Sequence, residues 1–597
     1  MKWKTKLVLN RDNMMYKLGV LSYKRKFCTL LIFGCLGFTT YTIDFTGYIK
    51  EWNEKISHFR SPRQIQADKK TFNNFEDNKY AMAQSAERLL GIPFVNIDTS
   101  NPYIPKQRIV HLDLKGAPPT LGFLKKFFLM IRNMGATGIL LEYEDMFPYY
   151  GVLKPIRARN AYTSKDIGSI LNYAEESNLM VIPLIQTFGH VEFALKHKEF
   201  EKLREVPASP QALCPNRNGT LEFVMEIVKQ VMELHPNSDY LHIGCDEVFQ
   251  MGECEICRSQ LHENLFLNHI KKISTSIHQK YPNLQLIIWD DMLRHLSQQA
   301  MIEMKLGDLI EPMVWVYAED IYHFVAPQIW EKYAIVFKTA WTASAFKGAF
   351  GETLYVPEAR RHLENNLRWM EVMAQQGKLF KLGFNGIVLT GWQRYDHFAV
   401  LCEILPASIP SLALNLITVT NGFFNLSLKT KLLSSLSCPQ GNSRNIQFIN
   451  LDSDPHLWEK LGRCMFPGSP VFRLMYRVHM IETEVIEYVQ ITTRQKGWLT
   501  AYNVRRNYSL PLRVDELTGG LPRVYHSMIS VAKSAVDSML GIFDNYTIAE
   551  WIEQRLYPYI IELEKIQNDS VTLKSIQNWP SRPLSIMKDL KRFGIVL

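Results

Sequence analysis

Between residues 106 and 410, short apolar runs alternate with stretches that are long enough for a helix. We count eight such runs, and many of their residues are β-branched, as in strands that are buried on both faces of a parallel sheet. The runs are Ile109–Leu114, Gly138–Glu142, Met180–Ile185, Tyr240–Gly244, Gln285–Trp289, Met313–Val316, Ile335–Thr339 and Gly386–Thr390. Eight strand–helix units in about 300 residues predict an α/β fold, the TIM (β/α)8 barrel.

An open, doubly wound sheet is the alternative architecture for this pattern. Its dinucleotide-binding form carries Gly-x-Gly-x-x-Gly after the first strand, and no such segment follows Ile109–Leu114. Helices are expected at Thr120–Met134, Ser164–Ser177, Thr220–Leu234 and Asn264–Lys280. The barrel therefore remains the preferred prediction.

Acidic and aromatic residues follow nearly every predicted strand. In a barrel, the carboxyl ends of the strands form the mouth of the active site. The candidates are Asp113, Lys115, Glu144, Asp145, His190, Asp246, Glu247, Trp289, Trp315, Tyr317, Trp341, Trp392, Arg394 and Asp396. Indole rings stack on the apolar face of a pyranose, and carboxylates bind its hydroxyl groups. Together these residue types indicate a sugar-binding site, although each has an ordinary explanation by itself.

The adjacent carboxylates Asp246 and Glu247 follow the run Tyr240–Gly244. Neighbouring residues on an extended chain face opposite ways, so a bend is needed for both to enter one site, and Gly244 offers the freedom for it. Two carboxyl groups in different environments can divide acid and base roles. The alternative is that the pair caps the N-terminus of a helix.

Several other chemistries lack their usual motifs. The sequence contains no His-Glu-x-x-His, no Walker loop and no Gly-x-Ser-x-Gly. Cys254-Glu-Ile-Cys257 is a single Cys-x-x-Cys, which is a weak zinc signal, and either cysteine could instead be oxidised or pair with Cys214. No metal or other cofactor is therefore expected, although a metal-dependent hydrolase that uses His190 and nearby acids is one hypothesis.

Two segments resemble the motifs of family 20 glycoside hydrolases, the β-N-acetylhexosaminidases. His242–Val248 is similar to the family signature His/Asn-x-Gly-x-Asp-Glu-x, and Pro183–His190 is similar to its Pro…Gly-His segment. The stretches His111–Pro119, Gln186–Phe193 and Gly391–His397 resemble most closely the hexosaminidase D branch. The resemblance spans roughly residues 106–410 and implies substrate-assisted, retaining hydrolysis of terminal N-acetylhexosamine from a glycan.

The same resemblance implies roles for the residues at the strand ends. Glu247 would be the general acid and then the base, and Asp246 would orient the acetamido group of the substrate. His190 would be linked to an acid after the second strand, Glu144 or Asp145, and would steady Glu247. This family is an exception to the use of two carboxylates in retaining hydrolysis.

The pocket for the acetamido group would be formed by aromatic residues. Tyr317 would bind the acetamido oxygen, and Arg394 or Asp396 would bind sugar hydroxyls. The expected pocket walls are Trp315, Trp341 and Trp392, and Trp289 is a further binding candidate. Typical family members carry an Arg after the first strand. Here Asp113-Leu-Lys115 takes that place, a departure shared with the branch associated with N-acetylgalactosaminides.

The N-terminal region differs from the rest of the chain. Residues 1–26 hold eight Lys or Arg against one Asp, so they carry seven of the nine net positive charges. Because the remainder is nearly neutral, no nucleic-acid partner is expected. Residues 27–43 contain no charged residue and are predicted to be a signal-anchor helix that follows a basic cytosolic tail, with residues 44–105 as a stem.

This anchor predicts a single-pass type II membrane protein of the secretory pathway, Golgi-like, with the catalytic domain in the lumen. A cleaved signal peptide and a buried core helix are the alternatives for residues 27–43. Five Asn-x-Ser/Thr sequons permit a secretory location. The hexosaminidase D branch is associated instead with nucleus and cytoplasm, which is the alternative location.

Residues 411–597 are predicted to be helical, with long helices at Val471–Val489, Arg523–Phe543 and Thr547–Gln567. They would pack against the barrel or form a homodimer surface. The predicted function is an exo-acting β-N-acetylhexosaminidase that removes terminal β-linked GalNAc or GlcNAc. The alternative is a catalytically inactive, glycan-binding barrel.

Overall fold

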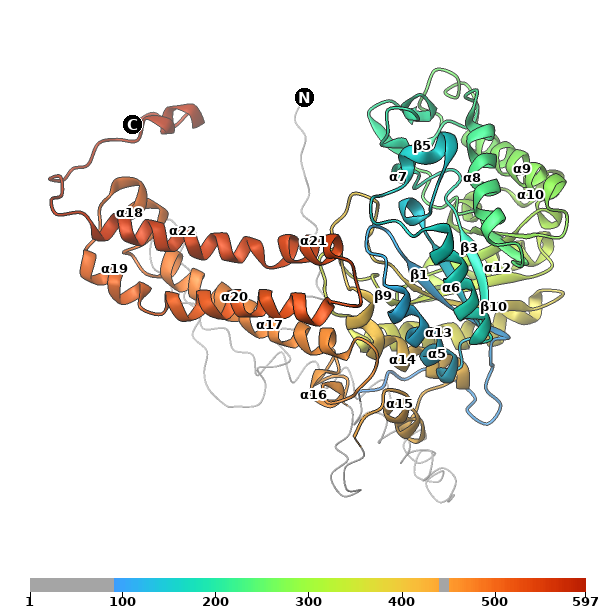
Figure 1. The fold of residues 1–597 in the computed structure, drawn as a ribbon. Helices are drawn as coiled ribbons and strands as arrows, with labels where there is room; N and C mark the ends of the chain where they lie inside the picture. Colours follow the sequence, from blue (N-terminus) through green and yellow to red (C-terminus); the bar gives the residue numbers. More distant parts are fainter. Residues whose placement is uncertain (1–90, 440–449) are drawn as a thin grey trace, which may run out of the picture. The chain divides into compact units, whose positions relative to one another are not determined.

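The computed structural model describes residues 91–439 and 450–597, and its centre is a closed barrel of eight parallel strands (Figure 1). Around the barrel the strands follow the order β1, β10, β9, β8, β7, β6, β3 and β2. Their bounds are β1 Gln107–Asp113, β2 Gly138–Glu142, β3 Met180–Leu184, β6 Tyr240–His242, β7 Gln285–Trp289, β8 Glu311–Trp315, β9 Ala340–Lys347 and β10 Phe384–Gly391. The predicted TIM barrel is confirmed.

Helices form the outer layer of the barrel (Figure 1). The longer ones are α5 Leu121–Met134, α6 Ser164–Glu176, α8 Thr220–Leu234, α9 His262–Lys280, α12 Pro327–Val336, α13 Ala359–Gln376 and α14 Leu405–Asn421. Thr163 begins α6 with a capping box, in which its side chain and that of Asp166 each accept a backbone N–H. The short helices are α7 Glu192–Leu195, α10 Gln298–Glu303 and α11 Ile321–Phe324.

The predicted strand Ile335–Thr339 was wrong. Helix α12 continues to Val336, and β9 begins at Ala340. Ile335 is 61% exposed, which does not suit a strand buried on both faces. Short apolar runs do not distinguish a helix end from a buried strand, and here the true strand, Ala340–Lys347, is rich in small residues.

A two-stranded antiparallel hairpin projects between β3 and α8. It consists of β4 Arg204–Val206 and β5 Ser209–Leu213. The backbone of the chain after β3 bonds to it, since Val191 N–H donates to Gln211 and Leu213 N–H donates to Phe188. The hairpin thus supports the loop that carries His190 at the mouth of the barrel.

The region after the barrel is helical, as predicted (Figure 1). Its helices are α15 Lys429–Ser435, α16 Trp458–Leu461, α17 Ser469–Gln490, α18 Ala501–Arg506, α19 Pro511–Thr518, α20 Leu521–Met539, α21 Asn545–Arg555 and α22 Tyr557–Lys574. The predicted single helix Thr547–Gln567 was wrong, because the helix is interrupted at Leu556, which separates α21 from α22. Pro558 has no backbone N–H and therefore starts a helix more readily than it continues one.

The C-terminal helices are joined to the barrel by specific bonds. Thr120, which begins α5, donates its backbone N–H to Ile542 over 2.7 Å. The guanidinium of Arg394 lies 2.6 Å from the carboxylate of Glu550 on α21. Helix α14 packs against both α13 and α17, so it lies between the barrel and the added helices.

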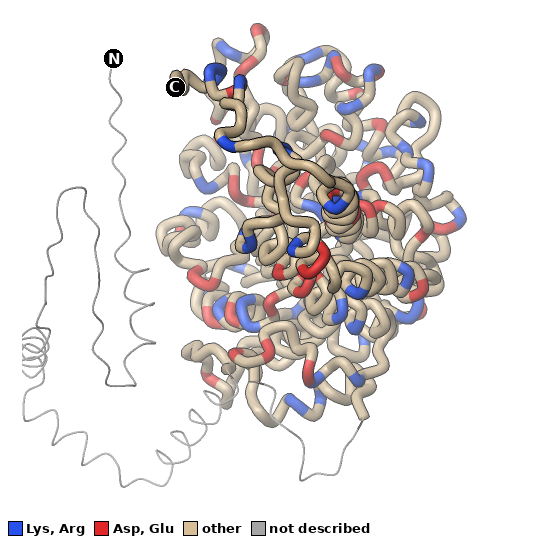
Figure 2. The backbone as a smooth tube through the Cα atoms, turned by 90° about the vertical axis from the view of Figure 1, so that its left-hand side faces the viewer, with Lys and Arg blue, Asp and Glu red and all other residues tan. Residues whose placement is uncertain are grey.

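The basic tail (residues 1–26), the anchor (27–43) and the stem as far as residue 90 lie outside the described residues. Among the helices of residues 91–439 and 450–597, none is long and apolar enough to cross a membrane. Lys and Arg are interspersed with Asp and Glu along the face shown in Figure 2.

Candidate active site

The loop after β6 carries the two adjacent carboxylates into the barrel mouth. Gly244, Cys245 and Glu247 all have positive φ angles, of 68°, 70° and 47°. This left-handed turn supplies the bend that the sequence requires, and Asp246 and Glu247 line the same pocket. A Cβ atom at Gly244 would overlap the side-chain amide of Gln186, so this position needs glycine for space as well as for conformation.

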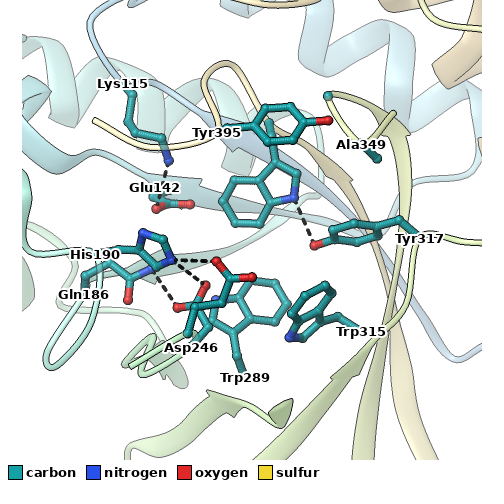
Figure 3. Close-up of a pocket in the computed structure, with 13 residues that line it drawn as sticks. Lys115, Glu142, Gln186, His190, Asp246, Trp289, Trp315, Tyr317, Ala349 and Tyr395 are labelled. Atoms are coloured by element: carbon teal, nitrogen blue, oxygen red, sulfur yellow. Dashed lines mark hydrogen bonds and ion pairs between the residues drawn. The ribbon is translucent and has the colours of Figure 1, made fainter. Parts of the chain in front are cut away.

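The pocket has a volume of about 180 Å³ and lies at the carboxyl ends of the strands (Figure 3). Its lining residues are Lys115, Glu142, Gln186, His190, Asp246, Glu247, Trp289, Trp315, Tyr317, Gly348, Ala349, Trp392 and Tyr395. Eight of these residues were candidates from the sequence: Lys115, His190, Asp246, Glu247, Trp289, Trp315, Tyr317 and Trp392.

Asp246 is the more buried of the two carboxylates. Its Oδ1 accepts a hydrogen bond of 3.1 Å from the Gln186 amide, and its Oδ2 lies 3.7 Å from Nε2 of His190. Burial raises the pKa of Asp246, the ring of His190 opposes that rise, and Glu142 and Glu247 add to it. Its charged form therefore depends on the donors that surround it.

His190 lies beside Asp246 in the pocket (Figure 3). Its Nε2 is 3.3 Å from Glu247 Oε2, and its Nδ1 is 3.9 Å from Glu192 Oε1. Burial alone would lower the pKa of His190, but Asp246, Glu247 and Glu192 together raise it to about 10. These three carboxylates therefore hold the His190 ring in its protonated form.

The expected link between His190 and Glu144 or Asp145 was wrong. Glu144 instead accepts a 2.8 Å hydrogen bond from Nδ1 of His397, whose Nε2 lies 2.6 Å from the ammonium of Lys196. The Lys196 ammonium is also 3.5 Å from Asp145. Neither acid lines the pocket, and both contact His397 in the loop that follows β10.

Lys115, which lies two residues after the end of β1, is almost fully buried. Its ammonium lies 3.3 Å from Asp113, 3.4 Å from Glu142 and 3.5 Å from Glu144. Burial would lower the pKa of Lys115, but these three carboxylates hold it well above the ordinary value. Lys115 is therefore a charged group that lines the pocket. Asp113 forms an ion pair with it but does not line the pocket itself.

Glu142 is a pocket residue that the sequence analysis missed. It ends β2 and pairs in register with Asp113 at the end of β1. Its Oε2 accepts a 3.0 Å hydrogen bond from His111, whose Nδ1 accepts the backbone N–H of Gly391. Burial opposes its ionisation, but Lys115 and His111 lower the pKa of Glu142 to about 2. Glu142 is thus a fixed anion that faces the pocket.

Aromatic side chains form another wall of the pocket (Figure 3). The rings of Trp315 and Tyr317 lie 5.2 Å apart, and Trp392 donates its indole N–H to the Tyr317 hydroxyl over 2.9 Å. Because Tyr317 accepts this bond, its own hydrogen remains available to donate. Asp291 accepts bonds from the Trp315 indole, at 3.1 Å, and from the backbone of Glu247, at 2.9 Å.

Trp341 was wrongly expected to be a pocket wall. It lies near the start of β9, at the opposite end of the strand from the site, and is fully buried. Its indole donates to Glu311, the first residue of β8, over 2.8 Å, and its ring meets that of Tyr240. The shifted position of β9 explains the error, because a tryptophan that follows a strand would face the mouth, whereas one that starts a strand faces the other end.

Arg394 and Asp396 were also expected in the pocket but have structural contacts instead. Arg394 donates to the backbone carbonyls of Lys115 and Ala399 and to Glu550 of α21. Asp396 is exposed, and its Oδ1 accepts the backbone N–H groups of Phe398 and Ala399. Neither residue lines the pocket.

Gln186 and Tyr395 complete the set of missed pocket residues with functional side chains. Gln186 directly follows the run Met180–Ile185, so its place after a predicted strand could have identified it. Tyr395 lies beside Arg394, and its hydroxyl accepts the backbone N–H of Gly351 over 2.7 Å. No spacing in the sequence predicts that contact, because it joins the loops after β9 and β10.

The chain matches the family model described as Glycosyl hydrolase family 20, catalytic domain, over residues 142–322. Together with the relatives below, this match shows that the chain belongs to glycoside hydrolase family 20. It is a glycoside hydrolase of the β-hexosaminidase type and lies near the hexosaminidase D branch of that family.

Hexosaminidase D of Homo sapiens is 36% identical over 493 residues, which cover 81% of this chain and 98% of that protein. Hexosaminidase D of Bos taurus is 43% identical over 332 residues, covering 54% of this chain and 95% of that protein. Among solved structures, the chitobiase of Flavobacterium johnsoniae is 14% identical with a TM-score of 0.43, covering 80% of this chain and 74% of that chain.

Proposed function

We propose that this β-hexosaminidase is exo-acting and removes terminal, non-reducing β-linked GalNAc or GlcNAc by substrate-assisted, retaining hydrolysis. The observation that carries this proposal is the placement of Asp246 and Glu247 in one pocket, with His190 in contact with both. A pocket confined to the barrel mouth suits the terminal residue of a glycan.

In the proposed reaction, Glu247 protonates the glycosidic oxygen while the acetamido oxygen of the substrate attacks the anomeric carbon. The bond to the leaving group breaks, and an oxazolinium ion forms within the sugar. Glu247, now ionised, then takes a proton from the water that attacks the same carbon. Its side chain is 39% exposed, so both the leaving group and water have access to it.

Asp246 is proposed to accept the acetamido N–H and to stabilise the developing positive charge. The Gln186 amide donates to its Oδ1, which fixes the carboxylate, and its second oxygen faces His190. Such preorganised charge costs no rearrangement during the reaction. Asp291, which bonds the backbone of Glu247, holds the turn that positions both acids.

Tyr317 is proposed to donate its hydroxyl hydrogen to the acetamido oxygen. The bond from Trp392 orients this hydroxyl, and Trp289 and Trp315 line the same pocket. A small apolar acetyl methyl group would contact these indoles. This arrangement aims the acetamido oxygen at the anomeric carbon, which is the positioning that substrate assistance requires.

Lys115 and Glu142 are proposed to bind sugar hydroxyls in place of the usual arginine. Both line the pocket, and both keep their charge because each is the other's partner, with nitrogen and oxygen 3.4 Å apart. Tyr395 lines the pocket as well. The preference between GalNAc and GlcNAc, with GalNAc favoured, is assigned to these side chains.

The test is release of p-nitrophenol from the β-GalNAc and β-GlcNAc glycosides by the wild type, Glu247→Gln and Asp246→Asn. We expect kcat to fall by about 10²- to 10⁴-fold when the general acid is lost. Glu222→Gln is the matched control, because Glu222 is an exposed carboxylate on the barrel helix α8. Activity retained in Glu247→Gln would overturn the assignment. A folded, inactive wild type that binds the sugars would favour the glycan-binding alternative.

A luminal, membrane-anchored location is part of the proposal, with nucleus and cytoplasm as the alternative. Cys438 and Cys464 form a disulfide, a bond that persists in oxidising compartments. The sequon residues Asn218 and Asn507 are exposed. We expect glycans that an endoglycosidase removes and a Cys438–Cys464 peptide under non-reducing conditions. Unmodified sequons in alkali-extractable protein would contradict a luminal anchor. A homodimer stays a prediction that sedimentation can test.

A further inference from the structure

Three cysteines and a glutamate meet beside the active site, outside the pocket. Glu205 belongs to β4, Cys214 follows β5, and Cys254 and Cys257 lie in the loop between β6 and α9. All four side chains are buried, and one ligand atom from each lies within 4.8 Å of the others. The cluster thus joins the β4–β5 hairpin to the loop that follows the catalytic carboxylates.

The sulfur positions are those of ligands around a common centre. Cys214 Sγ is 3.5 Å from Cys254 Sγ and also 3.5 Å from Cys257 Sγ. A disulfide needs about 2.0 Å between its sulfurs and joins only two of them. In a tetrahedral zinc site with Zn–S distances of about 2.3 Å, sulfurs lie about 3.8 Å apart. The observed separations are close to the second arrangement and far from the first.

Glu205 supplies a fourth ligand. Its Oε1 accepts the backbone N–H groups of Glu253 and Cys254, at 2.8 and 2.9 Å, which fixes the carboxylate. Its Oε2 is buried and has no hydrogen-bond donor among the described residues. A buried carboxylate oxygen without a donor is costly, and a bound cation removes that cost. One carboxylate oxygen of Glu205 belongs to the same cluster as the three sulfurs.

The surroundings suit a negatively charged metal centre. Three thiolates and one carboxylate around Zn²⁺ carry a net charge of −2. Arg217 interacts with both Cys214 and Cys254, and its buried Nε has no hydrogen-bond partner in the described part of the chain. Asn216 directs its amide N–H to Cys257 Sγ at 3.5 Å. Such outer contacts orient ligands and offset their charge.

We propose that Glu205, Cys214, Cys254 and Cys257 bind one Zn²⁺ ion in a closed, structural site. On binding, the three thiols lose their protons to solvent and the ion loses its water ligands, with no redox change. All four positions are taken by protein atoms, so the ion has no open position for catalysis. Zinc binding at this site can be tested without any measurement of the proposed hydrolysis.

The ion would position the catalytic loops through the hairpin. Gln211 of β5 lies between the ligands Glu205 and Cys214 in the chain, and its side-chain amide donates to the backbone carbonyl of Glu247 over 3.0 Å. Its own backbone carbonyl accepts the N–H of Val191, next to His190. One residue of the hairpin therefore contacts both loops that supply the acid and the histidine. Glu205, Cys214, Cys254 and Cys257 are accordingly positioning residues.

The first test is the metal content of the full-length chain, purified without chelator or affinity tag. We expect about one zinc per chain by mass spectrometry, with X-ray absorption showing three sulfurs at about 2.3 Å and one oxygen at about 2.0 Å. Replacement by Co²⁺ should give the intense visible spectrum of a tetrahedral thiolate site. Fewer than three sulfur ligands, or no bound metal, would overturn the proposal.

Variants separate a metal site from a structural thiol cluster. Cys254→Ser combined with Cys257→Ser should abolish zinc binding, and Glu205→Gln should retain the sulfurs but release zinc to a chelator at least tenfold faster. Cys402→Ser is the matched control, because Cys402 is a buried free cysteine elsewhere, and its zinc content should equal that of the wild type. If the double variant does not fold, thiol titration of the wild type decides: a disulfide among the three cysteines, or thiols that react without zinc release, would refute the site.

Discussion

Nε2 of His190 lies 3.3 Å from Oε2 of Glu247, although 57 positions separate them in the sequence. Each residue has a left-handed backbone, with φ angles of 51° and 47°. This conformation costs about 1–2 kcal/mol for residues other than glycine. Two strained positions therefore meet at one contact, and the bonds around the loops hold them there. Such strain is found where the position of a side chain matters for function.

The histidine in this contact predicts a pH dependence of stability. The pKa of His190 is about 10 in the folded protein and about 6.5 in an unfolded chain. Its contribution is therefore complete below pH 6.5 and is lost as the pH rises toward 10. We expect the free energy of unfolding of the wild type to fall across this range more steeply than that of His190→Gln. Urea unfolding at several pH values measures the difference.

His295→Gln is the control, because His295 is exposed on the turn after β7. Its pH dependence should match that of the wild type. Equal slopes for His190→Gln and the wild type would show that Asp246, Glu247 and Glu192 do not hold the ring protonated.

Gly244→Ala should reduce kcat by about 100-fold, the effect of a misplacement of about 1 Å near the reacting groups. The added methyl group would overlap the Gln186 amide, which bonds Asp246, and Gly244 has a φ of 68°. Gly168→Ala is the matched control, since nothing lies within 4 Å of its Cβ position in helix α6. That change should stabilise the protein by about 0.5–1 kcal/mol without changing kcat. Full activity in Gly244→Ala would contradict the packing.

Two tryptophans that resemble each other in the sequence should differ in effect. Trp315→Phe should raise KM about five- to tenfold, because it removes a pocket wall and the bond to Asp291. Trp341→Phe should leave KM unchanged and lower the free energy of unfolding by about 1–3 kcal/mol, since its bond to Glu311 lies at the other end of the barrel. Steady-state kinetics and thermal unfolding of both variants check this contrast, and a raised KM in Trp341→Phe would refute it.

Lys115→Met should both destabilise the fold and weaken substrate binding. Removing the ammonium leaves Asp113, Glu142 and Glu144 without their shared cation, a loss of about 3–5 kcal/mol for a buried ion cluster. Lys125→Met is the control, because its pair with Glu176 is exposed and contributes at most about 1 kcal/mol. The ratio of kcat/KM for GalNAc and GlcNAc glycosides should change only in Lys115→Met. An unchanged ratio would remove Lys115 from sugar recognition.

The barrel could be predicted because most of its strands have a clear sequence pattern. Buried parallel strands are continuous apolar runs, and seven of the eight predicted runs overlap the observed strands. Strand β9 was missed because Ala340–Lys347 is rich in small residues, whereas the preceding end of α12 is more apolar. Periodicity cannot separate these two cases in so short a run. Because of this error, Trp341 was predicted at the mouth of the barrel, whereas it lies at the opposite end.

The sequence predicts only those pocket residues whose position follows from lying at the end of a strand. Asp246 and Glu247 lie within five residues of the end of β6, and Trp315 is the last residue of β8, so topology places all three at the barrel mouth. The direction of a side chain beyond a strand depends on the turn, and Glu144 in the turn after β2 pairs with His397 and does not line the pocket. Arg394 could not be assigned, because its partner Glu550 lies 156 positions later in a separate helix.

Helix α14, Leu405–Asn421, is buried on nearly every side because α5, α13 and α17 all pack on it. A helix of this kind has no polar face. Deletion of the C-terminal helices would therefore expose apolar surface of α14, and we expect the isolated barrel to be insoluble. Heating should accordingly give one calorimetric transition, with barrel and C-terminal helices melting together. For protein engineering, a shortened enzyme should therefore retain helices α14 to α22 together with the barrel.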